Sequence, residues 1–211
     1  MVKYNKIETV FERDTEGSKK LIEGRFTNST VAFLAESVPW RFTEKIDGTN
    51  IRIFWNGHNV EFGGRTETAQ IPAHLVNKLN EMFMNEETEQ LFEQLFGEKE
   101  VHLFGEGYGA KIQKGGEYRP DVSFILFDVM IGENYQPRET VEQIAKSFNL
   151  EVVPVVLQGS ISDAVDFIKQ NPPSTIGKAK MEGVVGVPMM ELRDRCGKRV
   201  IVKIKAKDFG G

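Results

Sequence analysis

Residues 43–50 read TEKIDGTN, in which Lys45 stands two positions before an Asp-Gly pair with strand-like sequence on both sides. Residues 40–47 (WRFTEKID) alternate apolar with polar side chains, and residues 51–55 (IRIFW) follow the same pattern. Such alternation is typical of strands with one buried face, and Asp-Gly favours a turn. The stretch therefore predicts antiparallel strands with a lone lysine at the end of the first.

Further strands and helices alternate along the chain on either side of this stretch. Asn56-Gly57 suits a two-residue hairpin turn with positive φ. Apolar residues at helical spacing predict one or two amphipathic helices between Pro72 and Gly97. Other strands are expected at 100–106, 122–130, 151–157, 181–188 and 199–206, and other helices from Pro137 to about Phe148 and, capped by Ser162, through Lys169. Strands outnumber helices and several lack a crossover helix, which predicts an α+β fold of antiparallel sheets with flanking helices.

Length and composition set the outer bounds. With 211 residues, 40% of them hydrophobic, the chain has room for one sizeable core or at most two small ones. No apolar run approaches the roughly 20 residues that span a bilayer, and the start MVKYNKIETV lacks the apolar stretch of a secretory signal. The single cysteine, Cys196, allows no internal disulfide. We expect one domain, residues 1–211, in a reducing, cytoplasmic compartment and not in a membrane.

The charge is uneven along the chain. A formal net charge of −4 means that nucleic-acid binding would rest on a local patch. Such a patch is present from residue 176 onward, where basic residues outnumber acidic ones. Taken alone, such a patch is more often a solvated surface of mixed charge than a binding site. The basic residues are Lys178, Lys180, Arg193, Arg195, Lys198, Arg199, Lys203, Lys205 and Lys207.

Several familiar site chemistries find no support. His58, His74 and His102 lack metal-ligand spacing, so a zinc enzyme is not indicated. FGEGYGAK (104–111) lacks the second glycine before its lysine, and isoleucine follows where a phosphate loop needs Ser or Thr. No G-x-S-x-G elbow occurs, and Cys196 has no evident base partner, so it reads as an ordinary turn residue.

A lysine is a useful nucleophile only when its amine is neutral, and nearby cations favour that form. Strand alternation in VIVKIKAK (200–207) places Lys203, Lys205 and Lys207 on one face. The row suits an exposed edge protected from aggregation. Together with an isolated lysine nucleophile, it suits a clamp for phosphate oxygens.

Five segments in order resemble the motifs of the covalent lysine nucleotidyltransferases, which comprise DNA ligases, RNA ligases and mRNA capping enzymes. KIDG resembles the nucleophile motif, and EKIDGTN followed by GGRT is most similar to RNA ligases of bacteriophage type. The resemblance implies an antiparallel-sheet, ATP-grasp-like ligase adenylation domain. The segments are KIDG (45–48), FGEGYG (104–109), FILFDV (124–129), MEGVVGVP (181–188) and VKIK (202–205).

The resemblance implies three displacements at phosphorus. Lys45 would attack ATP to store AMP as a lysyl-AMP phosphoramidate, the AMP would pass to a 5′-phosphate, and a 3′-hydroxyl would then displace it. Lys203 and Lys205 match lysines that hold the α-phosphate. Glu182 matches the carboxylate placed for Mg²⁺ or Mn²⁺. Asp47 is open between metal binding, the reacting hydroxyl and shaping the turn.

The resemblance also assigns a nucleoside site. Phe127 looks like the ring that stacks on adenine, and a side chain that simply fills the core is the less favoured alternative. Glu106 looks like the acceptor for a ribose hydroxyl. Asn50 matches a residue near the phosphate or reacting end, and Arg65 one that contacts sugar and phosphate. Glu44 is a contact to the adenine edge, mostly through its backbone.

The sequence stops at KDFGG, soon after the fifth motif, so we expect neither a C-terminal oligonucleotide-binding domain nor a helical one. The strand would then be held by an accessory protein or by basic stretches at 193–199 and 109–120, the latter with Lys111, Lys114 and Arg119. We expect a monomeric ATP-dependent RNA ligase of RNA or mixed RNA/DNA ends, acting in nucleic-acid repair in a cell or, if virus-encoded, in the host cytoplasm. A DNA ligase or GTP-dependent capping enzyme is one alternative. A catalytically inactive nucleotide- or nucleic-acid-binding protein is another, disfavoured because Lys45, Glu182, Lys203 and Lys205 are all present.

Overall fold

A computed structural model describes residues 1–210, which divide into two compact units. Unit 1 comprises Met1–Tyr4 and Asp47–Val153, and unit 2 comprises Asn5–Ile46 and the chain from Pro154 onward. The backbone therefore passes from one unit to the other three times, after Tyr4, Ile46 and Val153. No helix within residues 1–210 combines the length and apolar character needed to cross a membrane.

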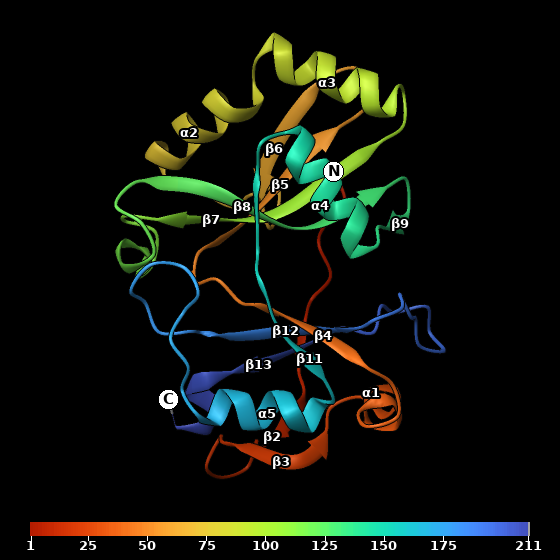
Figure 1. Cartoon of the computed structure of the whole chain (residues 1–211), viewed down its shortest axis with the longest axis vertical. Helices are drawn as coiled ribbons and strands as arrows, with labels where there is room; N and C mark the ends of the chain where they lie inside the picture. The colour runs from red at the N-terminus through yellow and green to blue at the C-terminus, as the bar shows by residue number, and fades with distance from the viewer. Residues whose placement is uncertain (211) are drawn as a thin grey trace. The chain divides into compact units, whose positions relative to one another are not determined.

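Unit 1 is built on a six-stranded sheet with helices packed against it (Figure 1). Neighbouring strands are antiparallel except β10, which pairs in parallel with β8. The strand order is β10-β8-β7-β5-β6, with β9 on β8. The strands are β5 (Thr49–Trp55), β6 (Val60–Gly64), β7 (Val101–Gly109), β8 (Val122–Ile131), β9 (Asn134–Tyr135) and β10 (Glu151–Val152). The helices are α2 (Ala73–Phe83), α3 (Glu86–Phe96), the 3₁₀ turn η1 (Gly115–Glu117) and α4 (Arg138–Ser147).

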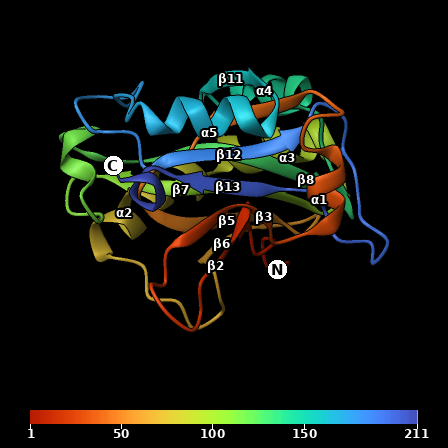
Figure 2. The same cartoon turned by 90° about the horizontal axis from the view of Figure 1, so that it is seen from below.

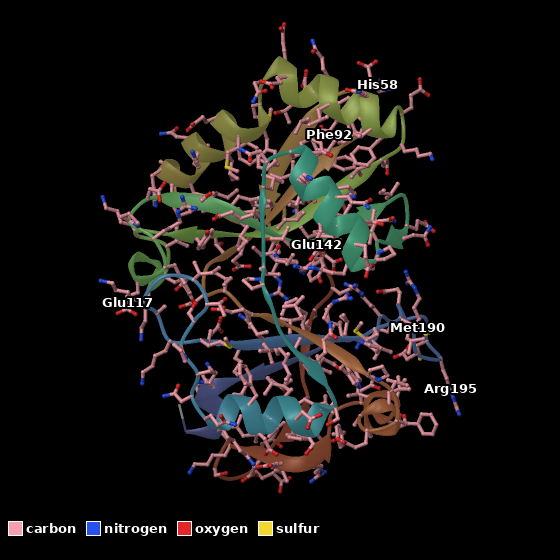
Figure 3. The ribbon with its side chains drawn as sticks, viewed as in Figure 1. His58, Phe92, Glu117, Glu142, Met190 and Arg195 are labelled. Carbon is pink, nitrogen blue, oxygen red and sulfur yellow. The ribbon has the colours of Figure 1, made fainter. Side chains whose placement is uncertain are left out.

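The helices of unit 1 cover one face of this sheet. Alternate residues of β5 and β8, such as Ile53 and Phe124, are fully buried against apolar residues of the helices. Phe92 of α3 (labelled in Figure 3) stacks on Trp55 and contacts Phe148 beyond α4. Burial of these side chains is the main contribution to the stability of unit 1.

The first four residues lie on the opposite face of the same sheet. The Val2 backbone N–H donates to Nε2 of His102 at 2.9 Å, and the Tyr4 hydroxyl donates to Asp128 at 2.8 Å. The buried guanidinium of Arg52 donates to the carbonyls of Met1, Val2 and Gly64. This face thus mixes polar groups with aromatic rings such as Phe104, and residues 1–4 cover one part of it.

Unit 1 should lose stability in mild acid because of His102. Burial, helped by nearby positive charges that include Arg52, lowers the pKa of His102 to about 4, from 6.5. The unfolded chain takes up this proton below pH 6.5 while the folded chain stays neutral, so the free energy of unfolding should fall by up to about 3 kcal/mol between these pH values. Urea titrations at several pH values would measure this fall.

Tryptophan fluorescence can report on unit 1 alone, because the sequence has two tryptophans and a Trp40→Phe background leaves Trp55 as the probe. In that background His102→Gln keeps an acceptor for Val2 but cannot titrate, so the fall between pH 6.5 and 4 should disappear. The same pH dependence in both proteins would contradict the assignment to His102.

Unit 2 is built on a five-stranded sheet in the order β1-β13-β12-β4-β11. Its pairs are antiparallel except β1 with β13. Helix α5 lies along β12 (Figure 2), and its apolar side packs on a core that includes Trp40, Phe42 and Val184. The strands are β1 (Glu8–Thr9), β2 (Phe11–Arg13), β3 (Leu21–Phe26), β4 (Trp40–Glu44), β11 (Val155–Gly159), β12 (Gly183–Pro188) and β13 (Val202–Lys205), of which β2 and β3 form a separate hairpin. The helices are α1 (Ser29–Leu34), α5 (Ile161–Lys169) and the 3₁₀ turn η2 (Ala206–Phe209).

The predicted α+β class with mainly antiparallel sheets is confirmed. The apolar pattern between Pro72 and Gly97 forms two helices, because Asn85 caps α3 by accepting from the backbone of Thr88. The strand predicted at 151–157 is wrong as one element. It divides at Val153-Pro154 into β10 in unit 1 and β11 in unit 2.

Three local predictions are corrected. The cap of α5 is Ser160, not Ser162, because Ser160 and Asp163 form a reciprocal capping box. The turn at Asn56-Gly57 belongs to a four-residue loop, since Trp55 pairs with Val60. Lys207 lies in η2, so the strand row of lysines contains Lys203 and Lys205 alone.

Candidate active site

Lys45 is positioned by the central strands of unit 2. Its backbone N–H donates to the carbonyl of Gly183 at 2.9 Å, and Gly183 pairs on its other side with Lys205. A side chain at Gly183 would place its first carbon 2.1 Å from the Ile204 carbonyl oxygen, so only glycine allows the strands to approach this closely. The two lysines therefore flank Gly183 at one end of the sheet.

One carboxylate joins these two lysines. Glu182 accepts from the Lys45 ammonium at 2.7 Å through Oε2 and contacts that of Lys205 at 3.0 Å through Oε1. Between 20% and 25% of each side chain remains exposed, so a ligand could reach all three. We call Lys45, Glu182 and Lys205 the lysine–carboxylate cluster.

The electrostatics of the cluster favour an anion. Burial by itself would raise the pKa of Glu182, but the charges and hydrogen bonds of Lys45 and Lys205 outweigh it and lower the pKa below its usual value. Glu182 is therefore ionised at neutral pH, and the cluster of two ammonium groups and one carboxylate is positive. Lys203 lies two residues before Lys205 on the same face of β13.

The Glu44 side chain has a structural role. Its carboxylate is 1% exposed and accepts from the Ser174 hydroxyl and from both the backbone N–H and the hydroxyl of Thr175. The backbone N–H of Glu44 donates to Pro154. The side chain thus holds the turn at residues 174–176, whereas the expected backbone contact to adenine stays a prediction.

Three residues predicted from the sequence lie on strands of unit 1, namely Asn50, Glu106 and Phe127. Asn50 of β5 and Glu106 of β7 are directly opposite one another, on the sheet face away from the helices. The Oδ1 atom of Asn50 is buried and has no hydrogen-bond partner within residues 1–210.

Phe127 lies at a bulge in β8. The pairing with β7 steps from Asp128 to Leu126 and leaves Phe127 out of register. Its ring is half-buried among buried neighbours and touches Tyr4 edge-on at 5.0 Å between centroids, whereas Phe124 is fully buried in the core. A bulge redirects one side chain and is common beside functional sites, so Phe127 is the ring of β8 that is open to a ligand.

Asp47 and Arg65 adjoin the ends of β5 and β6. The Asp47 backbone N–H donates to the Tyr118 hydroxyl at 3.2 Å, which leaves the half-buried carboxylate for other use. Gly48 is required because a side chain there would place its first carbon 2.3 Å from the Gly107 carbonyl oxygen. Arg65 follows β6 and is exposed.

In the basic loop 109–120, Arg119 is expected from the sequence to contact phosphate, but the structure shows that it is paired within unit 1. Arg119 donates to Asp121, Glu151 and the Tyr108 hydroxyl, and the hydrogen bonds to Asp121 raise its pKa. The guanidinium is therefore committed to partners within unit 1. Lys111 and Lys114 remain the cations of that loop suited to a strand.

The stretch 193–199 is a turn stabilised by its own hydrogen bonds. Arg193 donates to the Gly197 carbonyl, and Arg199 pairs with Glu191. Arg195 points outward from this stretch, on the same segment as Met190 (Figure 3). Arg195 is thus an exposed cation of this turn.

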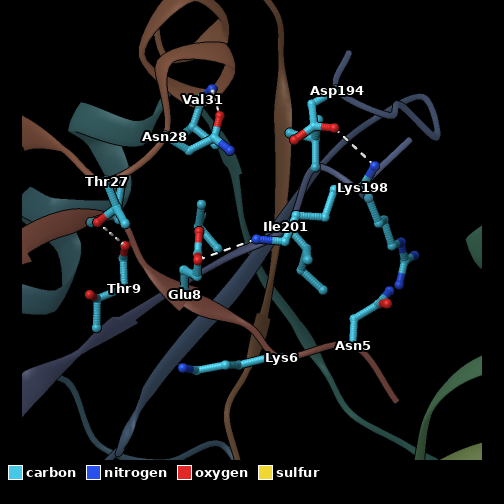
Figure 4. A pocket seen from close by; sticks show the side chains of 14 residues that line it. Asn5, Lys6, Glu8, Thr9, Thr27, Asn28, Val31, Asp194, Lys198 and Ile201 are labelled. Carbon is cyan, nitrogen blue, oxygen red and sulfur yellow. Dashed lines mark hydrogen bonds and ion pairs between the residues drawn. The ribbon is translucent and has the colours of Figure 1, made fainter. Parts of the chain in front are cut away.

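A small pocket of unit 2 lies elsewhere (Figure 4). It has a volume of about 70 Å³ and is lined by residues of β1, the start of α1 and the segment 194–202. Its charged groups are partly paired with one another, as Lys198 is with Glu8. No member of the lysine–carboxylate cluster lines it, and ligand pockets are usually several hundred Å³, so it is too small for a nucleotide.

The side chains around Lys45 are suited to a hard divalent cation that takes most of its oxygen ligands from a bound substrate. No group of three or more His, Cys, Asp or Glu side chains forms a metal cage within residues 1–210. Mg²⁺ commonly uses one or two carboxylates together with water and substrate phosphates. Glu182 is an ionised oxygen donor of that kind.

Comparison with known proteins identifies the family. The family model for RNA ligase matches residues 38–205, about four fifths of the chain. The chain belongs to the RNA ligase family. The matched region begins just before β4 and ends with β13, so the whole lysine–carboxylate cluster falls within it. No curated protein matches the chain.

Solved RNA ligases share the fold. A lysine-to-alanine variant of Naegleria gruberi RNA ligase with ATP and Mn matches with a TM-score of 0.67 and 18% identity, covering 97% of this chain and 59% of that one. The same ligase with PPi matches at 0.64 and 18%, covering 98% and 62%. Another variant with AMP and Mn matches at 0.64 and 17%, covering 97% and 60%. This chain thus spans about three fifths of the length of these ligases.

Sequence reasoning missed two supporting residues. Thr175 anchors Glu44, and Tyr118 holds the backbone of Asp47. PPST marks a turn and EYRP marks a loop, but neither pattern indicates which strand end the segment will contact. These contacts depend on tertiary structure and have no local sequence signal.

Proposed function

We propose that this RNA ligase family member is an ATP-dependent RNA ligase that joins a 5′-phosphate to a 3′-hydroxyl through lysyl-AMP and an adenylylated strand. The observation that carries the proposal is the contact of Glu182 with both Lys45 and Lys205. This contact brings the primary amine of Lys45 and the ammonium group of Lys205 together on one carboxylate.

In the proposed first step the Lys45 amine attacks the α-phosphorus of ATP, an N–P bond forms and pyrophosphate leaves. The amine must be neutral to attack, so the proton on the ammonium in the Lys45–Glu182 pair has to be released first. Lys205 and Lys203 neutralise charge on the oxygens of the transferring phosphoryl group. Catalysis then rests mainly on positioning and charge.

Unit 1 supplies the groups that we propose for the nucleoside. Phe127 offers a half-buried ring for the base, and Glu106 offers an acceptor for a ribose hydroxyl. The unpartnered Oδ1 atom of Asn50 and the exposed Arg65 are proposed to contact the sugar and phosphate. We propose that Glu44 contacts the adenine edge through its backbone, because its carboxylate is already bonded to Thr175.

Glu182, with Asp47 as a second candidate, would bind Mg²⁺ or Mn²⁺. The bound ion would supply positive charge to the phosphate oxygens. Glu182 would have to loosen its contacts with the lysines to bind it, which leaves Lys45 free for the reaction.

The test is transfer of label from α-labelled ATP to the purified protein with Mg²⁺, with α-labelled GTP in parallel. We expect covalent label from ATP and its later transfer to a 5′-phosphorylated RNA strand. Label from GTP alone would indicate capping chemistry, and joining restricted to DNA would indicate a DNA ligase. No label from either nucleotide would overturn the proposal.

Phe127→Ala should weaken ATP use with little effect on stability. Stacking of a base on an aromatic ring is worth about 1–3 kcal/mol, so the KM for ATP in lysyl-AMP formation should rise by a factor between about 5 and 150. Phe127→Tyr keeps the ring and should stay near wild type, and Phe33→Ala removes a ring that is 78% exposed in unit 2 as the control. Equal KM values for Phe127→Ala and wild type would remove Phe127 from the nucleotide site.

For substrates we propose RNA or mixed RNA/DNA ends, held by Lys111, Lys114 and Arg195 or by an accessory protein. A monomer acting in the cytoplasm on broken RNA, of the bacteriophage type, is the simplest biological setting. Competition between nicked duplexes and single strands in the joining assay would identify the preferred end.

A further inference from the structure

Residues 172–181 form a loop that is anchored at both ends beside the lysine–carboxylate cluster, and we call it the anchored loop. At its start the Glu44 carboxylate holds Ser174 and Thr175, and Glu44 directly precedes Lys45. At its end Met181 leads directly into Glu182. Within the loop, Pro173 pairs with Lys180, and the Ser174 backbone N–H donates to the Ala179 carbonyl.

The anchored loop carries two exposed lysines. Lys178 and Lys180 flank Ala179, which is buried, so both side chains extend into solvent. Within residues 1–210 the structure shows no ion pair or hydrogen bond of either ammonium group. Lys180 is two residues from Glu182, so their Cα atoms are at most about 7 Å apart.

These lysines increase an existing positive charge. Lys45 and Lys205 already exceed the one charge of Glu182. The nearby carboxylate of Glu44 is buried and satisfied by Ser174 and Thr175, so it is directed away from solvent. Two further cations beside such a cluster attract an anion with more than one phosphate group.

We propose that the anchored loop is a phosphate-binding arm, in which Lys178 and Lys180 bind a phosphate group next to the one that reacts at Lys45. This inference rests on the proposed function and adds a binding role for residues outside the five motifs. Two sources offer the required chemistry, namely the β- and γ-phosphates of ATP and the backbone phosphates of the strand. The anchor through Glu44 fixes the arm relative to the nucleophile in either case.

The test compares Lys178→Ala/Lys180→Ala with wild type in two assays. The first measures the KM for ATP in lysyl-AMP formation, and the second measures the KM for joining a pre-adenylylated RNA strand without ATP. We expect a roughly tenfold rise in one of the two, because lysine–phosphate contacts are charge-assisted. A rise in the first assay identifies ATP as the source, and a rise in the second identifies the strand.

The matched control is Lys99→Ala/Lys146→Ala, which removes two exposed lysines of unit 1. Lys178→Arg/Lys180→Arg keeps both charges and should stay near wild type in both assays. If wild type is active and the alanine variant behaves like the control, the phosphate-binding arm is overturned while the proposed function stands. If wild type forms no lysyl-AMP, both are overturned.

A second variant tests the anchor. Thr175→Val removes one hydroxyl bonded to Glu44 but keeps the β-branched shape and both lysines. We expect the KM in the affected assay to rise about threefold with the rate at saturation unchanged, since one hydrogen bond to a charged group is lost. Lower stability with unchanged KM values would overturn the positioning role of the anchor.

Discussion

Lys45→Ala is expected to abolish covalent labelling by α-labelled ATP, with a rate at least about 10⁴-fold below wild type, because no other group replaces the attacking amine. The fold should survive. Lys45 is 25% exposed, and its removal takes away one partner of Glu182 while Lys205 stays as the other. The measurement is label retained on the denatured protein, alongside a thermal unfolding curve.

Lys45→Arg separates chemistry from charge. Arginine keeps the positive charge beside Glu182, but its guanidinium does not lose its proton in proteins and cannot attack phosphorus. It should be as inactive as Lys45→Ala while preserving the ion pair. Both variants should still join a pre-adenylylated strand, because that step does not use the amine. Label on Lys45→Ala would show that a different residue is the nucleophile.

Glu182→Gln is expected to reduce the rate of lysyl-AMP formation about 100-fold, in the range found for losing one group that stabilises charge in a transition state. Glutamine preserves the shape but removes the anion that Lys45 and Lys205 share and the proposed donor to Mg²⁺. The cost in stability should be near 1 kcal/mol, because the pair is partly exposed. Single-turnover labelling at several Mg²⁺ concentrations measures the effect.

Glu23→Gln is the matched control, since Glu23 pairs with Lys169 at 2.6 Å elsewhere in unit 2. It should label at the wild-type rate.

The pH dependence of the labelling rate gives a second check on Glu182. The lowered pKa of Glu182 means that the cluster keeps its anion above the ordinary value of 4.5 and loses it as pH falls through the lower folded value. A wild-type rate for Glu182→Gln would exclude Glu182 from the chemistry.

The strands that carry Lys203 and Lys205 and that lead into Lys45 could be predicted from the sequence because they depend on local patterns. The alternation of residues 40–47 predicts β4, and the spacing of Lys203 and Lys205 predicts their shared face on β13. Both patterns reflect side chains on opposite sides of a pleated strand. Their partners in the sheet depend on tertiary structure.

The errors have physical causes. Residues 152–157 are apolar throughout, but Pro154 has no N–H to continue a ladder, and the chain changes sheets there. Ser162 resembles a cap as closely as Ser160 does until the reciprocal bond with Asp163 is known. Arg119 looked available for a phosphate because the sequence does not show that its side chain turns back to Asp121, two residues on, or that the distant Glu151 also pairs with it.

The order of synthesis matters for a chain in which unit 1 is inserted within unit 2. Residues 47–153 can fold as soon as they leave the ribosome, because nearly all of unit 1 is then present. The Lys45–Glu182 contact spans 137 positions, and β4 must wait for β11 and β12 before it has its neighbours. A product released early would lack the lysine–carboxylate cluster, and its unpaired β4 edge would be a target for aggregation and degradation. Only chains translated through Lys205 contain all three members of the lysine–carboxylate cluster.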